Sequence, residues 1–159
     1  MTIPQSHITD SQGLIGDAEI EMYQIDLSGG SSLFLTPDYT RTWNGHTWDG
    51  CAIKLTGEGT FSNDQVAKPR LQIQNPDGLY SQLVSQGSLN KALVTRYRVL
   101  LSDLNDNVPI YVSNIWQVNR IASLNKLIVD AELRGLSDAT NFIIPADTYQ
   151  PPNYPAVTL

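Results

Sequence analysis

The sequence predicts an all-β protein, an antiparallel β-barrel or β-sandwich of about eight strands with one short helix. Short segments alternate apolar and polar residues, most clearly residues 69–75 and 92–101. Clusters of Gly, Pro, Asn and Asp separate such segments at intervals of about 8 to 12 residues. Only residues 79–86 space their apolar side chains as a helix does. With 159 residues, the chain suits one domain with a substantial core.

The first predicted strand spans residues 18–27 and changes its apolar face midway. Its apolar residues fall at positions 18, 20 and 22, and then at 23, 25 and 27. A β-bulge near Met22 or Tyr23 would explain the change, because one extra residue moves all later side chains to the other face. Residues 28–32 have the composition of a hairpin loop, and residues 33–35 supply a short return strand.

The dipeptide Asn44-Gly45 is the clearest local signal in the chain. Both residue types accept positive φ, and Trp43 and Trp48 flank them, so residues 42–48 are predicted to form a tight hairpin. The other predicted strands are residues 52–55, 69–75, 92–101, 108–120 and 126–133, with turns at residues 103–107 and 123–125.

The two ends differ in composition from the centre, which predicts three regions. Residues 1–17 have no apolar period and are expected to form an arm that orders only against another surface. Residues 18–145 form the β domain. Residues 146–159 contain three prolines with Tyr149 and Tyr154, and this extension is expected to lie extended along a partner.

The charge composition limits the kinds of partner. The chain has 10 Lys and Arg against 16 Asp and Glu, and only 16% of its residues are charged. Such a polar but weakly charged surface suits a subunit that contacts neighbours. The excess of acidic residues argues against a nucleic-acid-binding face, which needs clustered cations. We expect neither export nor membrane association, because the chain has no long apolar run and residues 1–15 lack the pattern of a signal peptide.

No catalytic or metal-binding pattern is recognisable, so we expect no enzyme activity, no cofactor and no metal. Cys51 is the only cysteine, which excludes an internal disulfide and a cysteine-built cluster. His7 and His46 lie far apart in the sequence, and no nucleophile motif accompanies either. Residues 103–107 resemble the start of a calcium loop but lack its glycine and its final glutamate, so a polar turn is the favoured interpretation.

Asp17, Glu19 and Glu21 alternate with apolar residues and therefore share one face of the first strand. Most faces of this kind are simply solvated. A face of this charge would repel a polyanion such as the phosphate backbone of DNA.

The aromatic residues allow two interpretations. Trp43 and Trp48, together with Tyr23, Tyr97 and Trp116, are numerous enough for a sugar-binding platform. The favoured alternative is that they fill the β core or a subunit interface, where Trp and Tyr are common. We therefore take Trp43 and Trp48, with Tyr149 and Tyr154, as candidate interface residues.

Several short segments follow one another in a characteristic order between residues 18 and 145. They are IEMYQIDL (20–27), TWNGHTW (42–48), GEGT (57–60), KPRLQIQN (68–75) followed by Gly78, VTR (94–96), LSD (101–103), WQV (116–118) and FIIP (142–145). No single segment is specific, but their order resembles that of the amino-terminal domain of the phage lambda minor tail protein L family.

The resemblance implies a β-barrel-like domain related to tail-tube and hub proteins, assembled as a ring around the tail axis. It implies a structural role at the virion tail tip, between the distal tail-tube protein and the central fibre or hub protein. The ring would be a trimer, with a hexamer as the alternative, and DNA would only pass through it. Asp17, Glu19 and Glu21 are our candidates for the lining of this channel, because their carboxylates would repel the phosphate backbone. Longer family members carry a cysteine-rich iron–sulfur region, which this sequence lacks. The alternative function is a carbohydrate- or receptor-binding β domain on the phage tail.

Overall fold

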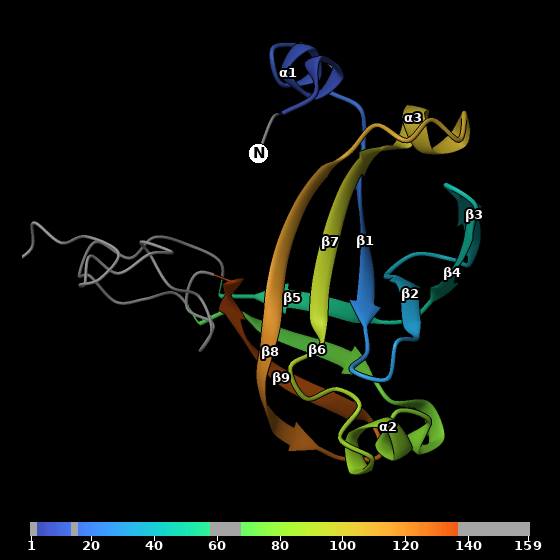
Figure 1. Cartoon of the computed structure of the whole chain (residues 1–159). Helices are drawn as coiled ribbons and strands as arrows, with labels where there is room; N and C mark the ends of the chain where they lie inside the picture. Colours follow the sequence, from blue (N-terminus) through green and yellow to red (C-terminus); the bar gives the residue numbers. More distant parts are fainter. Residues whose placement is uncertain (1–2, 14–15, 58–67, 137–159) are drawn as a thin grey trace, which may run out of the picture.

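The computed structural model describes residues 3–13, 16–57 and 68–136, and it confirms the all-β class (Figure 1). The described residues form nine strands in one sheet, ordered β3-β4-β2-β1-β7-β8-β9-β6-β5. All neighbours are antiparallel except β2 and β4, and the sheet is not a closed barrel. The strands are β1 Glu19–Asp26, β2 Ser32–Thr36, β3 Arg41–Trp43, β4 His46–Gly50, β5 Ile53–Thr56, β6 Arg70–Gln74, β7 Leu93–Leu100, β8 Val112–Leu124 and β9 Ile128–Gly135.

The long strand β8 joins two parts of the sheet that lie at a steep angle to each other. Its first half pairs with β7 and its second half with β9. The pairing with β9 shifts register between Val118 and Arg120 and again between Ile121 and Ser123. Such irregularities bend a strand. As a result β5, β6 and β9 cross below the long strands β1 and β7 (Figure 1).

The fold has two hydrophobic cores on opposite faces of β1 and β7. The first core lies between the two parts of the sheet and includes Tyr23, Ile25, Leu71, Ile73, Val94, Val118, Val129, Ala131 and Leu133. The second core lies on the other face, under the β3–β4 hairpin and the helix α3 (Leu101–Asn105), and consists of Met22, Trp43, Trp48, Val99 and Leu104.

The predicted bulge in β1 is wrong, and the two cores explain the pattern that suggested it. β1 pairs with β7 in one continuous register from Glu19 to Asp26. Met22 and Tyr23 are adjacent, point to opposite faces and are both fully buried, one in each core. The apolar face changes because the strand passes from one core to the other.

The predicted hairpin at residues 42–48 is confirmed. Trp43 pairs with His46 across a two-residue turn, in which φ is 50° at Asn44 and 75° at Gly45. Positive φ at both positions is the geometry that Asn-Gly favours.

Replacing Gly45 with alanine should lower the free energy of unfolding by at least about 1 kcal/mol, because the added Cβ strains a backbone at positive φ. No heavy atom lies within 4 Å of the added carbon, so the cost is purely conformational. Gly29→Ala is the control, since Gly29 is equally open and lacks positive φ. Urea unfolding measures both variants, and equal stabilities would contradict the prediction.

The single predicted helix is shorter than expected. α2 spans Ser81–Ser85 and follows a 3₁₀ turn, Pro76–Gly78. Leu83 packs against the first core, but Leu79 is 64% exposed. Leu79 lies between the 3₁₀ turn and α2, outside the helix, so the helical spacing predicted for residues 79–86 does not hold at its first residue.

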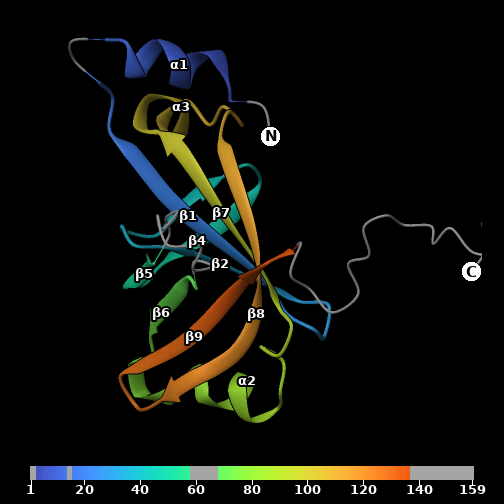
Figure 2. The same ribbon diagram turned by 90° about the vertical axis from the view of Figure 1, so that its left-hand side faces the viewer.

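The structure differs from the predicted elements at two further helices and at the end of β8. α1 (Gln5–Ser11) lies within the expected irregular arm, although it buries none of its residues. α3 replaces part of the expected turn at 103–107, because buried Leu104 anchors it in the second core. β8 continues through Leu124, where a turn was expected. α1 and α3 lie together at one end of the molecule, and α2 lies at the other (Figure 2).

Candidate functional site

The predicted acidic face lies at the α1 end of β1, and arginines of β7 share it. The register places Arg98 opposite Glu21 and Arg96 opposite Tyr23. Arg96 Nη1 lies 3.2 Å from Glu21 Oε1, and Arg98 Nε lies 3.8 Å from Glu19 Oε1. The Tyr23 hydroxyl donates a hydrogen bond to Glu21 Oε2. We call Glu19, Glu21, Arg96 and Arg98 the ionic network.

The ionic network weakens the electrostatic argument for a face that repels DNA. Each carboxylate of Glu19 and Glu21 has an arginine partner, and the Nδ1 atom of His7 lies 3.8 Å from Glu19 Oε1. Ion pairs of this kind cancel the field that would repel DNA phosphates. The proximity of these residues to a DNA channel stays a prediction, but repulsion by Glu19 and Glu21 no longer supports it.

Asp17 differs from the other two acidic residues, because backbone amides rather than arginines contact its carboxylate. Its Oδ2 accepts a hydrogen bond from the Ser102 amide at 2.8 Å, and its Oδ1 accepts one from the Ala18 amide. The interaction with the Ser102 side chain, followed by the hydrogen bond from the Ser102 amide, lowers the pKa of Asp17 below its ordinary value of 3.8. The amide of Asp17 also donates to Asp10 Oδ1 at 2.6 Å, which ties the α1 segment to β1.

Asp17→Asn should make the stability of the protein less sensitive to acid. The folded state holds the pKa of Asp17 below its unfolded value, so the unfolded state binds the proton first as the pH falls. The stabilising contribution is therefore complete above about pH 4 and is lost on acidification through the folded pKa. Urea unfolding at pH 7 and pH 3 should show a smaller difference for the variant, and an unchanged difference would contradict this role.

Trp43 and Trp48, two candidate interface residues, are buried inside the chain itself. Their exposed fractions are 1% and 2%. Trp43 Nε1 donates to the carbonyl of Val108 at 3.2 Å, and Trp48 Nε1 donates to the carbonyl of Trp43 at 3.1 Å. Neither ring has surface left for a neighbouring subunit, so the interface assignment is corrected to a core role. The hydrophobic gain from packing the rings under the hairpin explains this.

The third tryptophan does not complete a sugar-binding platform. Trp116 is half-buried, packs against the first core and lies under the Arg96 guanidinium, 5.4 Å from its ring centre. The three tryptophans therefore do not form one exposed surface, which opposes the carbohydrate-binding alternative. The other two candidate interface residues, Tyr149 and Tyr154, lie outside the described residues.

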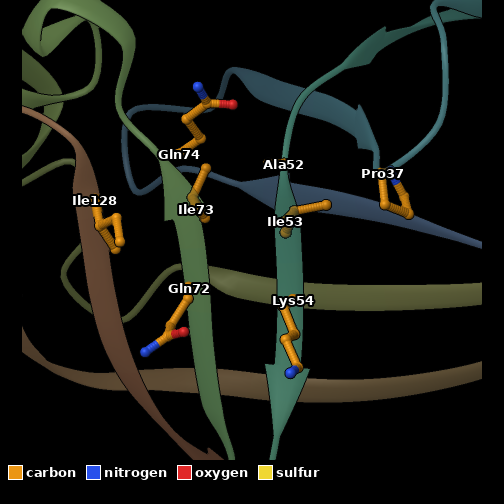
Figure 3. Close-up of a pocket in the computed structure, with 8 residues that line it drawn as sticks. All are labelled: Pro37, Ala52, Ile53, Lys54, Gln72, Ile73, Gln74 and Ile128. Carbon is orange, nitrogen blue, oxygen red and sulfur yellow. The ribbon is translucent and has the colours of Figure 1, made fainter.

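A shallow groove of about 400 Å³ lies along the exposed face of β5 and β6, and its lining includes Ile53 and Ile73, two buried residues of the first core (Figure 3). Gln72 and Gln74 of β6 and Lys54 of β5 supply its polar groups. Pro37 and Ile128 flank it on either side, and Ile128 is 41% exposed. Sequence reasoning did not identify this groove, because it depends on which strands are neighbours.

The described residues offer no constellation for metal binding or nucleophilic chemistry. No group of three His, Cys, Asp or Glu side chains among residues 3–13, 16–57 and 68–136 could hold a metal ion. Burial raises the pKa of the Cys51 thiol, which disfavours a reactive thiolate. Burial, followed by the neighbouring Cys51, raises the pKa of Tyr80 to about 12. In the same ranges, no helix is long and apolar enough to cross a membrane.

The chain is similar in fold to a solved structure, although not in sequence to a known family. No family model and no curated protein sequence matches the chain. Among solved structures, the fold is similar to a chain in the virion of the native gene transfer agent (GTA) particle, with a TM-score of 0.63 and 15% sequence identity. The match covers 87% of this chain and 47% of that chain, so this chain spans about half the length of its structural neighbour.

Proposed function

We propose that this chain is a structural subunit of a virion. The observation that carries the proposal is the fold similarity to a GTA virion chain across 87% of the residues. The ordered segments that resemble the minor tail protein L family support the same interpretation independently, because they come from the sequence and not from the fold. Together they favour a part in particle architecture over an enzymatic one.

More specifically, we propose a place in the tail tip or baseplate hub of a tailed bacteriophage. The subunit would join the distal tail-tube protein to the central fibre or hub protein, in a ring of three or six copies around a DNA channel. The described ionic groups fit a non-catalytic role, because the carboxylates of Glu21 and Glu132 engage arginines within the chain. Receptor binding by exposed tryptophans has weaker support, since Trp43 and Trp48 are buried.

Immunogold electron microscopy of the phage particles tests the proposal. Antibodies raised against the purified chain should label the distal end of the tail, and particles from a phage with a stop codon early in the gene should lack a completed tip. The same phage supplied with the wild-type chain in trans is the control. Label on the capsid, along the whole tube or on no particle would contradict the proposal.

A further inference from the structure

The groove beside β5 and β6 has unused hydrogen-bonding groups. Gln72 and Gln74 are two residues apart on one strand, so their side chains lie about 7 Å apart on the same face. Lys54 lies opposite Gln72 across the β5–β6 pair. Within the part of the chain that the structure describes, no hydrogen bond engages these two amides or this ammonium group. The site can therefore donate to a ligand that lacks donors of its own.

The outer face around the groove is basic, although the chain as a whole is acidic. Cross-strand pairing places Arg70 beside Glu132, and Glu132 beside Arg120. Arg120 binds Glu132 through two hydrogen bonds of 2.7 and 2.9 Å. This face carries half of the ten Lys and Arg residues against two carboxylates, Asp130 and Glu132. The five cations are Lys54, Lys68, Arg70, Arg120 and Arg134.

We propose that this groove binds residues 146–159 of a second copy of the chain. The inference rests on the proposed function, because a ring needs a contact between copies. Residues 146–159 contain one acidic residue, Asp147, and no Lys or Arg, so their charge complements the basic face. The three prolines favour an extended backbone without internal hydrogen bonds, and its free carbonyls suit the amide donors of Gln72 and Gln74.

The groove also has apolar surfaces, and it lies near the start of β9. Pro37 and Ile128 provide surfaces on which the proline and tyrosine rings of the segment can pack. Ile128 is the first residue of β9, and Gly135, its last, lies about 23 Å farther along the strand. The groove therefore lies at the opposite end of β9 from Gly135. Asp147 is the candidate partner for Lys54.

A charge exchange between the two surfaces tests the proposal on the full chain. Analytical ultracentrifugation should show concentration-dependent association of the wild type, and either Lys54→Glu or Asp147→Lys alone should weaken it by up to about fivefold. An equimolar mixture of the two variants should restore association, because each groove then meets a segment of opposite charge. Lys91→Glu is the control for net charge, since Lys91 is exposed and outside the groove.

A second pair of variants tests the apolar wall. Ile128→Ser should weaken association, whereas Leu79→Ser, which removes a side chain that is 64% exposed elsewhere on the surface, should leave it unchanged. Equal effects of the two substitutions would overturn the assignment of this groove. Circular dichroism of both variants confirms that the fold is retained.

The outcomes separate the proposal from its alternatives. A chain that carries both Lys54→Glu and Asp147→Lys is measured as well. If association were restored in this double variant but not in the mixture of single variants, the segment would lie in its own groove, and the contact between copies would be overturned. No restoration in either, or a wild type that stays monomeric at all concentrations, would also overturn it. Tail-tip labelling by immunogold is independent of these measurements. A correctly located protein without charge rescue would therefore refute this inference alone.

Discussion

Replacing Trp43 with alanine is expected to lower the free energy of unfolding by about 3–5 kcal/mol. The ring is 1% exposed, its Nε1 donates to the Val108 carbonyl, and it packs edge-on against Tyr97 and Tyr111. Alanine would leave a cavity in the second core and remove one of the two hydrogen bonds that the Val108 carbonyl accepts, the other coming from the Ile110 amide. Equilibrium unfolding in urea measures the loss.

Trp116→Ala is the matched control for this prediction. It removes the same side chain from a half-buried position at the edge of the first core, so a smaller loss is expected. If Trp43→Ala had the same free energy of unfolding as the wild type and only weakened binding to a sugar or to a neighbouring subunit, the ring would belong to a binding surface. The core role assigned here would then be wrong.

Deleting residues 146–159 should abolish completion of the tail tip while the isolated domain stays folded. The buried residues of both cores end at Leu133, so the deletion removes no described core residue. We expect the free energy of unfolding to change by less than about 0.5 kcal/mol. Circular dichroism with a melting curve checks the fold, and electron microscopy of phage carrying the deletion checks the tips.

A variant with residues 146–159 in scrambled order is the control for length and composition. It should also fail to complete tips, because the prolines, tyrosines and Asp147 would occupy new positions. Unfolding of the truncated chain would show that the segment belongs to the core, and the domain boundary near residue 145 would be wrong. Normal tips would show that the contacts between subunits run through the β domain alone.

Local signals predicted the hairpin and the alternating strands well. The Asn44-Gly45 turn fixes its own register, and Trp43 and Trp48 fall on one face as a direct result. The strand at residues 69–75 was equally clear, since Leu71 and Ile73 are buried and Gln72 is exposed. In these segments the sequence period and the burial agree, because one face meets a core and the other meets water.

Features that depend on strand pairing could not be predicted. The ionic network needs Glu21 beside Arg98 and Tyr23 beside Arg96, and these residues lie more than 70 positions apart in the sequence. The alternating strand predicted at residues 92–101 puts Arg96 and Arg98 on one face, and this was the only signal in the sequence for a cluster of charges. Likewise, the change of apolar face in β1 was misread as a bulge. The order of apolar residues along one strand is the same whether an extra residue is inserted or a second hydrophobic core covers the other face.

The uninterrupted pairing of β1 with β7 has a mechanical consequence. The two strands are joined through eight consecutive residue pairs, from Glu19 with Leu100 to Asp26 with Leu93. A pulling force applied between the α1 end and the α2 end would act along these strands and load their hydrogen bonds in shear. Bonds loaded in this way share the tension and fail together, whereas bonds that are unzipped fail one at a time. The molecule is therefore built to resist stretching along its long strands more strongly than peeling at its β3 or β5 edges.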